Sequence, residues 1–104
     1  MRAITIKSVD AFVNARPFKS GNTRVEVRNG EVFFYLFDNM IAHKYEGGLY
    51  VTTCGWKSAT TKERLNGILR AYNLGSIFQN DFVWYLNYGT EDVGREFNSK
   101  RFEL

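Results

Sequence analysis

The chain has 104 residues, of which 44% are hydrophobic and 24% are charged, and its formal net charge is +3. This length fits one domain, because two smaller cores would bury too little apolar surface to offset the entropy lost on folding, and nine phenylalanines, six tyrosines and two tryptophans exclude a disordered chain. The single cysteine, Cys54, cannot form an internal disulfide, and together with the single histidine, His43, it provides too few ligands for a zinc site.

A short helix is expected near the N-terminus. Ser8 can cap the run 9–15, and Asp10 lies in the first turn, where a negative charge interacts favourably with the helix dipole. Pro17 cannot continue a helix and is expected to end this one. We therefore predict one or two helical turns that lie against a sheet.

Four antiparallel strands are expected next. Residues 22–28 alternate between apolar and polar side chains, which is typical of a half-buried strand. Asn29 and Gly30 follow, and both tolerate the positive φ angles of a type I′ turn, so 31–37 is predicted to return beside 22–28. A meander is completed by strands at 40–45 and 49–54, with turns at 38–39 and 46–48.

The best-defined element is a helix after the loop 55–59. Thr60 and Glu63 have the spacing of a capping box. Apolar residues recur at the helical spacing of one buried stripe: Leu65, Ile68, Leu69 and Tyr72. The charged residues expected outside this stripe are Lys62, Glu63, Arg64 and Arg70. Gly67 costs up to about 1 kcal/mol relative to alanine, which predicts either close packing, the interpretation we favour, or the approach of a partner.

The remaining elements complete the predicted fold. Residues 73–75 are expected to end the helix, and two strands follow at 76–79 and 82–87, around a turn at 80–81. The order α-ββββ-α-ββ predicts an α+β fold, with an antiparallel sheet of about six strands and the main helix packed on one face. Residues 1–87 are expected to form this single domain. Residues 88–104 are expected to form a C-terminal extension that packs loosely or becomes ordered on a partner.

The sequence shows no pattern typical of an enzyme. Gly47 and Gly48 lie between two strands, without the helix and the Lys-Ser/Thr pair that bind a phosphate. Cys54 and His43 are expected on adjacent strands, where we interpret them as a buried cysteine beside a half-exposed histidine. The acidic pair 91–92 is interpreted as a solvated part of the extension. We therefore expect no catalytic, metal or cofactor site and no small-molecule substrate.

The surface is expected to carry aromatic and basic side chains, because more rings are present than one helix-covered face can bury. Exposed rings near cations could bind a protein or stack the bases of single-stranded nucleic acid. Alternatively, Phe97 and Phe102 cover them in a small second cluster. The start of the main helix adds a loop tryptophan and cations near a natural anion site. The candidate partner-binding residues are Trp56, Lys57, Lys62, Arg64, Arg70, Arg24, Arg28, Lys44, Tyr35 and Tyr50.

No segment predicts export or membrane insertion. Residues 1–7 lack the apolar stretch of a secretory signal, and the longest apolar run, 32–37, is too short to cross a bilayer. We therefore expect a cytosolic protein without a membrane partner.

Three separated blocks, GNTRVEV at 21–27, GWKSATTKERLNGI at 55–68 and WYLN at 84–87, resemble a family of small proteins encoded by tailed bacteriophages. The resemblance carries over no catalytic or binding motif. It implies an accessory protein in the cytoplasm of the infected bacterium, and such proteins frequently bind and inhibit host proteins, including CRISPR and restriction systems. We therefore expect an inhibitor of a host protein. The alternative is a nucleic-acid-binding accessory protein that uses the basic and aromatic surface residues.

Overall fold

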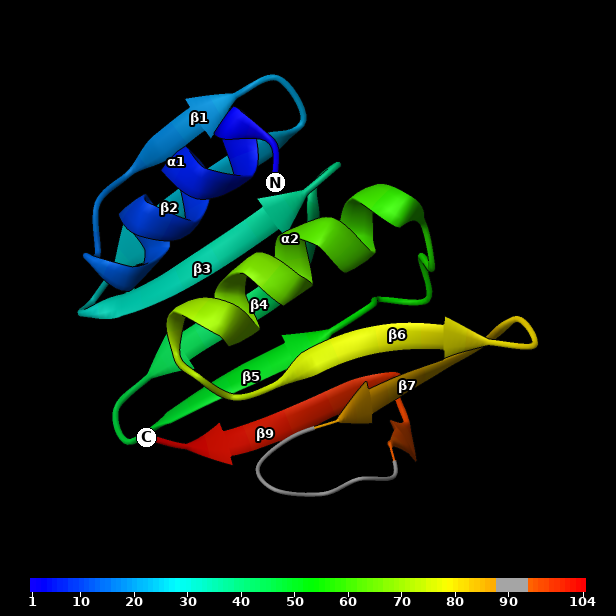
Figure 1. Cartoon of the computed structure of the whole chain (residues 1–104). Coiled ribbons are helices and arrows are strands. Elements are labelled where there is room, and N and C mark those ends of the chain that lie inside the picture. The colour runs from blue at the N-terminus through cyan, green and yellow to red at the C-terminus, as the bar shows by residue number, and fades with distance from the viewer. Residues whose placement is uncertain (88–93) are drawn as a thin grey trace.

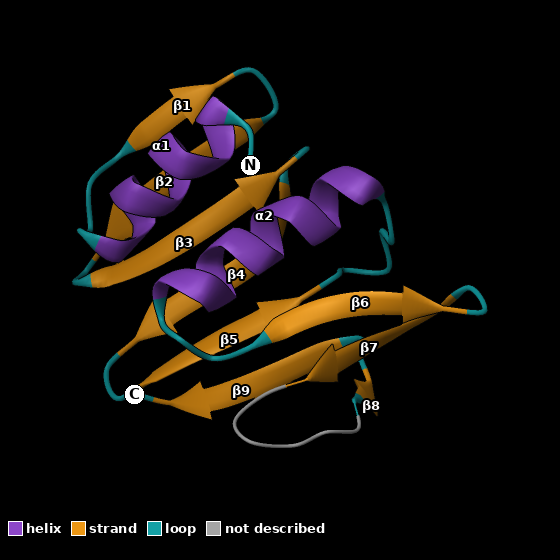
Figure 2. Ribbon diagram, viewed as in Figure 1, coloured by secondary structure: helices purple, strands orange, loops and turns teal. Residues whose placement is uncertain are grey.

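The computed structural model describes residues 1–87 and 94–104, which form an α+β fold of two helices and nine strands (Figures 1 and 2). In chain order the elements are α1 (Ala3–Val13), β1 (Phe18–Ser20), β2 (Thr23–Arg28), β3 (Glu31–Leu36), β4 (Asn39–Tyr45), β5 (Gly48–Thr52), α2 (Ala59–Ala71), β6 (Ser76–Asn80), β7 (Val83–Asn87), β8 (Arg95–Glu96) and β9 (Ser99–Glu103). The predicted α+β class and the order α-ββββ-α-ββ are confirmed, with additional strands at β1, β8 and β9.

The strands form two antiparallel sheets. The larger has the order β1-β2-β3-β4-β5-β9, and the smaller has the order β6-β7-β8. The predicted meander is present as β2 to β5. No strand was predicted at β1 or after Asn87, whereas β9 pairs with β5 along its whole length. Phe97 and Phe102 are buried, at 2% and 8% exposure, so this part of the predicted extension belongs to the core.

Both helices lie on the same face of the larger sheet (Figure 1), and β6 packs beside α2. One core therefore runs beneath the helices and the smaller sheet. The opposite face of the larger sheet, which we call the outer face, has no helix of the described residues on it. Two hydrogen bonds, which we call the clasp, join Thr53, just after β5, to Asn98, just before β9. The Thr53 hydroxyl donates to Asn98 Oδ1 at 2.5 Å, and the Thr53 N–H donates to the Asn98 carbonyl at 2.9 Å.

Of the four predicted hairpin turns, the one at 29–30 has the predicted position, the one predicted at 46–48 covers 46–47, and the other two are shifted. Asn29 and Gly30 have φ angles of 52° and 79°, which confirms the predicted type I′ turn. The β3–β4 turn is formed by 37–38 and the β6–β7 turn by 81–82, one residue away from the predicted 38–39 and 80–81 in each case. Both turns keep their aspartate, but the strand register places the predicted turn asparagine in a strand and puts a phenylalanine at positive φ instead.

The start of α1 was predicted incorrectly. The helix begins at Ala3 rather than after Ser8, and it ends at Val13, four residues before Pro17. Ser8 lies inside the helix, fully buried, and its hydroxyl donates to the Thr5 carbonyl at 3.2 Å. A buried serine that satisfies its hydroxyl within the helix is an alternative to capping that the local sequence does not distinguish.

Ser58, not Thr60, caps α2. Its hydroxyl oxygen accepts the Thr61 N–H at 3.1 Å, so the predicted capping box of Thr60 and Glu63 is wrong. Glu63 instead accepts hydrogen bonds from Thr5 and Arg2. The predicted stripe is confirmed, because three of its members are fully buried and the fourth packs against the core: Leu65, Ile68, Leu69 and Tyr72.

Gly67 permits close contact between the helices, as predicted. A Cβ atom at this position would lie 2.8 Å from the Thr5 methyl group and 3.0 Å from a Val9 methyl group, both on α1. Next to this contact, Arg64 is 1% exposed and donates to the Thr5 hydroxyl and to Glu63, each at 2.6 Å. Burial and the charge of Arg2 lower the pKa of Arg64, which nevertheless remains charged. Arg64 therefore joins α2 to α1 instead of lying on the surface.

Candidate functional sites

The outer face carries a row of aromatic and charged side chains across five strands. Cross-strand pairing places Glu26, Phe33, His43, Tyr50 and Arg101 in one line from β2 to β9. The Phe33 and His43 rings stack at 4.4 Å with an interplanar angle of 10°. The Arg101 guanidinium lies over the Tyr50 ring at 4.7 Å. Rings and cations are therefore arranged together on this face, as predicted for part of the candidate set.

The cations at one end of the row are held by neighbouring side chains. Arg24 lies over the Tyr35 ring at 4.1 Å and donates to Glu26 and Asp38, and these hydrogen bonds raise its pKa. Arg28 donates to the Tyr35 hydroxyl at 2.9 Å. A phosphate would have to compete with two carboxylates for Arg24. The ring faces are also partly covered, which leaves less area for stacking a base.

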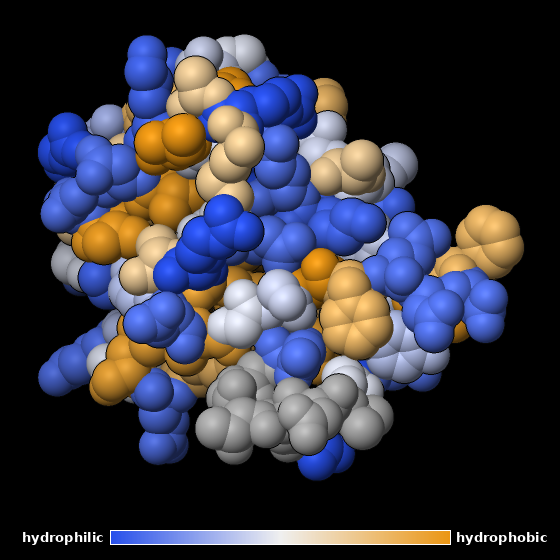
Figure 3. Space-filling view, in the orientation of Figure 1, coloured by the Kyte–Doolittle hydropathy of each residue, from blue (hydrophilic) through white to orange (hydrophobic). Residues whose placement is uncertain are grey.

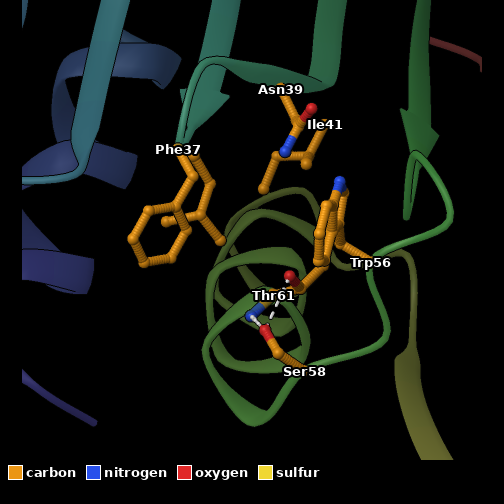
Figure 4. Close-up of a pocket in the computed structure, with 7 residues that line it drawn as sticks. Phe37, Asn39, Ile41, Trp56, Ser58 and Thr61 are labelled. Carbon is orange, nitrogen blue, oxygen red and sulfur yellow. Dashed lines mark hydrogen bonds between the residues drawn. The ribbon is translucent and has the colours of Figure 1, made fainter.

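A pocket opens at the end of the larger sheet, where the β3–β4 turn, the loop after β5 and the start of α2 meet (Figure 4). Its volume is about 360 Å³ and its lining residues are Leu36, Phe37, Asn39, Ile41, Trp56, Ser58 and Thr61. Leu36 and Ile41 are core residues, 2% and 1% exposed, so the floor of the pocket is the end of the core.

Two exposed rings form the rim of this pocket. Phe37 is 63% exposed and Trp56 is 64% exposed, and Figure 4 shows them on opposite sides of the opening. Phe37 also has φ 51°, a conformation that costs a bulky residue free energy. Both rings are exposed to water above an apolar floor. Exposure of this kind is unfavourable for an isolated monomer and is typical of a binding surface.

Charged residues lie near both rings of the pocket rim. A second hollow of about 500 Å³ shares Phe37 with the pocket and is lined also by Lys19, Arg24 and Asp38. Arg24 and Asp38 form an ion pair within it. Lys57 follows Trp56 and is exposed, and neither Lys57 nor Lys19 forms an ion pair within the described residues.

A further apolar area lies between the two helices, on the face shown in Figure 3. Met1 and Ile6 are 54% and 57% exposed there, and a shallow hollow of about 310 Å³ separates α1 from α2. Its lining includes aliphatic residues and no aromatic ring. Aromatic side chains dominate interface energetics, so the pocket at the end of the sheet is the stronger candidate.

The structure divides the predicted partner-binding residues between different places. Trp56 lines the pocket and the exposed Lys57 follows it in the loop, and four others lie on the outer face: Arg24, Arg28, Tyr35 and Tyr50. Lys62 lies over the Trp84 ring at 5.8 Å, and Arg70 is exposed near the end of α2. The ten residues therefore do not form one surface.

Two of the predicted partner-binding residues do not lie on the exposed surface where we expected them. Lys44 is on the helix-covered face, where its ammonium group donates to the Val13 carbonyl at 3.4 Å and lies over the Tyr72 ring. Arg64 is buried between the helices and cannot contact a partner. The bulge between Phe34 and Tyr35 in the β3–β4 pairing changes which face later residues occupy, and nothing in the local sequence of Lys44 reveals this bulge.

Sequence reasoning missed Phe37, which forms half of the pocket rim. It was predicted as the last residue of a strand, and its exposure depends on the turn position. Phe82, at 91% exposure and φ 66° in the β6–β7 turn, was missed for the same reason. The available signal was a phenylalanine next to aspartate at each turn, a pair that a two-residue turn would expose.

The structure brings no catalytic pair together at Cys54 and His43. The Cys54 thiol donates to the Met40 carbonyl at 2.9 Å, and the partial desolvation of the thiol raises its pKa, which opposes formation of the thiolate. His43 instead hydrogen-bonds Glu31. The prediction of a buried cysteine is wrong, because Cys54 is exposed at the start of the loop after β5.

Two further observations concern the described residues alone. Within 1–87 and 94–104, no group of three or more His, Cys, Asp or Glu side chains is arranged to hold a metal ion. In the same residues, no helix has the length and apolarity needed to span a membrane. The predicted solvated pair 91–92 lies outside the described residues.

Comparison with known proteins identifies a protein family. A family model described as "Kyanoviridae Gp96 protein" matches residues 1–103. No curated protein and no solved structure matches the chain. The match therefore spans both sheets, both helices and the pocket.

Proposed function

Since the chain belongs to the Kyanoviridae Gp96 family, a family of tailed cyanophages, we propose that it is a phage accessory protein that binds and inhibits a protein of its host. The predicted origin in a tailed phage is confirmed by this membership. Binding would take place in the cytoplasm of the infected cell. The target class to test first is a defence complex, such as CRISPR or restriction machinery, because the sequence resemblance implied that role.

The observation that carries the proposal is the pocket between Phe37 and Trp56. Core residues form its floor and two exposed rings form its rim, and the backbone of one rim residue, Phe37, is held at positive φ. Tryptophan is among the residues that most often dominate interface energetics when a partner covers it. A stoichiometric inhibitor needs such a surface and no catalytic group.

Nucleic-acid binding is the second candidate, and the charges of the outer face count against it. The Arg24 guanidinium is engaged by Glu26 and Asp38, and Arg28 lies 3.8 Å from Glu26. The net charge of +3 is small for a protein that binds phosphates. Affinity for single-stranded DNA or RNA is therefore expected to be weak and to fall steeply as salt rises.

The test is a pull-down of the tagged chain from nuclease-treated host lysate, followed by reconstitution with the purified partner. We expect a stoichiometric complex that survives moderate salt and that inhibits the partner's activity. Truncation of Trp56 to alanine is expected to weaken it by about 30-fold, the effect of losing one hot-spot residue. Phe82→Ala is the matched control, since Phe82 is also an exposed turn ring but does not line the pocket. Recovery of nucleic acid alone, or a complex that is equally stable without the Trp56 ring, would refute the proposal.

A further inference from the structure

We infer that the pocket between Phe37 and Trp56 binds one bulky apolar side chain that projects from an acidic segment of the partner protein. This inference rests on the proposed function and specifies the chemistry of the partner. It follows from the size of the pocket, from the hydrogen bonds that its polar groups already make, and from the charges near its two rim rings.

The size of the pocket suits a single anchoring side chain. Its volume of about 360 Å³ is near the lower end of the range for small-molecule sites, roughly 300 to 1,000 Å³. The pocket opens between the two rings of its rim, with Ile41 between them (Figure 4), and the buried Leu36 and Ile41 form its floor. A phenylalanine, leucine or methionine that enters between the rings would contact apolar atoms on three sides. It would also cover the exposed parts of Phe37 and Trp56.

The polar groups of the lining do not favour a polar ligand. The Ser58 hydroxyl oxygen accepts the Thr61 N–H at 3.1 Å, and the two hydroxyls hydrogen-bond each other at 3.0 Å. These atoms already cap α2, and Asn39 supplies the remaining polar side chain among the lining residues. A small-molecule site normally has several polar groups that converge on the ligand. This pocket has fewer, so an apolar side chain on a polypeptide fits it better.

The surroundings favour negative charge on that polypeptide. Lys19 lines the hollow beyond Phe37, and Lys57 is exposed and directly follows the rim residue Trp56 in the chain, so each rim ring has a nearby lysine without an ion pair within the described residues. The nearby carboxylate of Asp38 is already paired with Arg24. The N-terminal end of α2, which is at the pocket, also interacts favourably with anions. Carboxylates before and after the apolar anchor would therefore meet complementary charge.

Three synthetic heptapeptides test the inference directly. The first has a central phenylalanine flanked by glutamates, the second replaces the phenylalanine by alanine, and the third replaces the glutamates by lysines. Binding is followed in ¹⁵N-labelled protein through the indole N–H signal of Trp56, which a Trp56→Phe variant distinguishes from that of Trp84. We expect the first peptide to bind with a dissociation constant of about 0.1 to 1 mM, an affinity appropriate to one anchor and a few exposed charges. The other two are expected to bind at least fivefold more weakly.

Variants of the protein separate the anchor from the charges. Trp56→Ala and Phe37→Ala are expected to abolish binding of the first peptide, with ¹⁵N spectra confirming that the fold is intact. Charge reversal by Lys57→Glu or Lys19→Glu is expected to weaken it about three- to fivefold. Phe82→Ala is expected to leave it unchanged. Equal binding of the alanine or lysine peptide would overturn the inference, as would failure of all three peptides to shift the Trp56 signal.

Two other results assign the pocket differently. Analytical ultracentrifugation without peptide tests for self-association. Self-association that Trp56→Ala abolishes would show that a second copy of the chain occupies the pocket, and it would overturn the inference. A host complex that persists when the first peptide saturates the pocket would overturn the inference but leave the proposed function standing. Peptide binding at the pocket without any host complex would support the inference and refute the proposed function.

Discussion

The β6–β7 turn offers a direct measurement of backbone strain, through the change Phe82→Asn. Phe82 follows Asp81, and both residues have positive φ, 66° and 51°. Asparagine adopts this conformation readily, since its short polar side chain hydrogen-bonds locally, whereas a bulky residue does so at a cost. The change should therefore stabilise the fold, although it removes a large apolar side chain.

The magnitude follows from the exposure of the ring. Relief of the left-handed conformation is worth about 1 kcal/mol or slightly more. Full burial of a phenylalanine is worth about 1.5 to 3 kcal/mol, and Phe82 is 91% exposed, so the lost burial amounts to roughly 0.2 kcal/mol. The net gain is about 1 kcal/mol. In a domain of this size it raises the melting temperature by about 4 °C or more.

Phe37→Asn is the matched comparison. Phe37 has a similar φ of 51° but is only 63% exposed, so a little over a third of its burial energy, about 0.5 to 1 kcal/mol, is lost with the ring. This loss nearly cancels the relief of strain, and the expected change in stability is close to zero. Urea titration and thermal denaturation followed by circular dichroism measure both variants. A lower stability of Phe82→Asn, or an equal gain at both positions, would refute the reasoning.

Three further changes concern the contact between the helices. Arg64→Leu should destabilise the fold by about 2 to 4 kcal/mol in urea titration, because the buried Thr5 hydroxyl loses the guanidinium that donates to it and Glu63 loses one of its charged partners. Gly67→Ala should destabilise it by about 1 kcal/mol in the same assay despite the better helix propensity of alanine, since its Cβ would lie 2.8 Å from the Thr5 methyl group. Hydrogen bonds from Thr5 and Arg2 lower the pKa of Glu63. The ionised carboxylate therefore stabilises the fold at pH values above its unfolded-state pKa of 4.5. This contribution is lost as the pH falls through the folded-state pKa. Melting temperatures measured from neutral to acidic pH should therefore fall less for Glu63→Gln than for the wild type.

Each of these changes has a control on the same molecule. Arg70→Leu removes an exposed arginine from α2 and should change stability by less than about 0.5 kcal/mol. Arg70→Ala places the same alanine on α2 at an exposed position, where the new Cβ replaces one already present. Glu63→Gln is compared with the wild type over the same pH range. The interpretation of the helix contact fails if Arg64→Leu and Arg70→Leu are equally mild, if Gly67→Ala stabilises the fold, or if Glu63→Gln has the wild-type pH profile.

The elements that the sequence predicted well are those that local interactions determine. The apolar stripe of α2 depends on helical spacing within one segment, and the turn at Asn29 and Gly30 depends on the φ preferences of two adjacent residues. Strand β9 has neither signal. Its partner β5 is about fifty residues away along the chain, and its charged, alternating sequence becomes a strand only through that pairing.

Prediction of the surface residues failed where the reach of a long side chain or the register of a strand decides whether a residue is exposed. Helical spacing places Arg64 beside the buried stripe, but only the position of α1 shows that its guanidinium reaches Thr5. The face on which Lys44 lies depends on the register of β4, and the exposure of Phe37 depends on the position of its turn. Trp56 was predicted correctly as an exposed loop ring, because its neighbours in the sequence provide nothing to cover it.

The clasp between Thr53 and Asn98 has a consequence for folding kinetics. It holds together two points separated by the whole of α2 and the smaller sheet, so the larger sheet gains its β5–β9 ladder only after a long intervening segment has been closed. The entropy of that closure is lost before the ladder contributes any stabilisation, and non-local pairing of this kind slows the crossing of the folding barrier. The meander β2 to β5, whose strands are neighbours along the chain, can therefore assemble first and serve as the template on which the last strand docks.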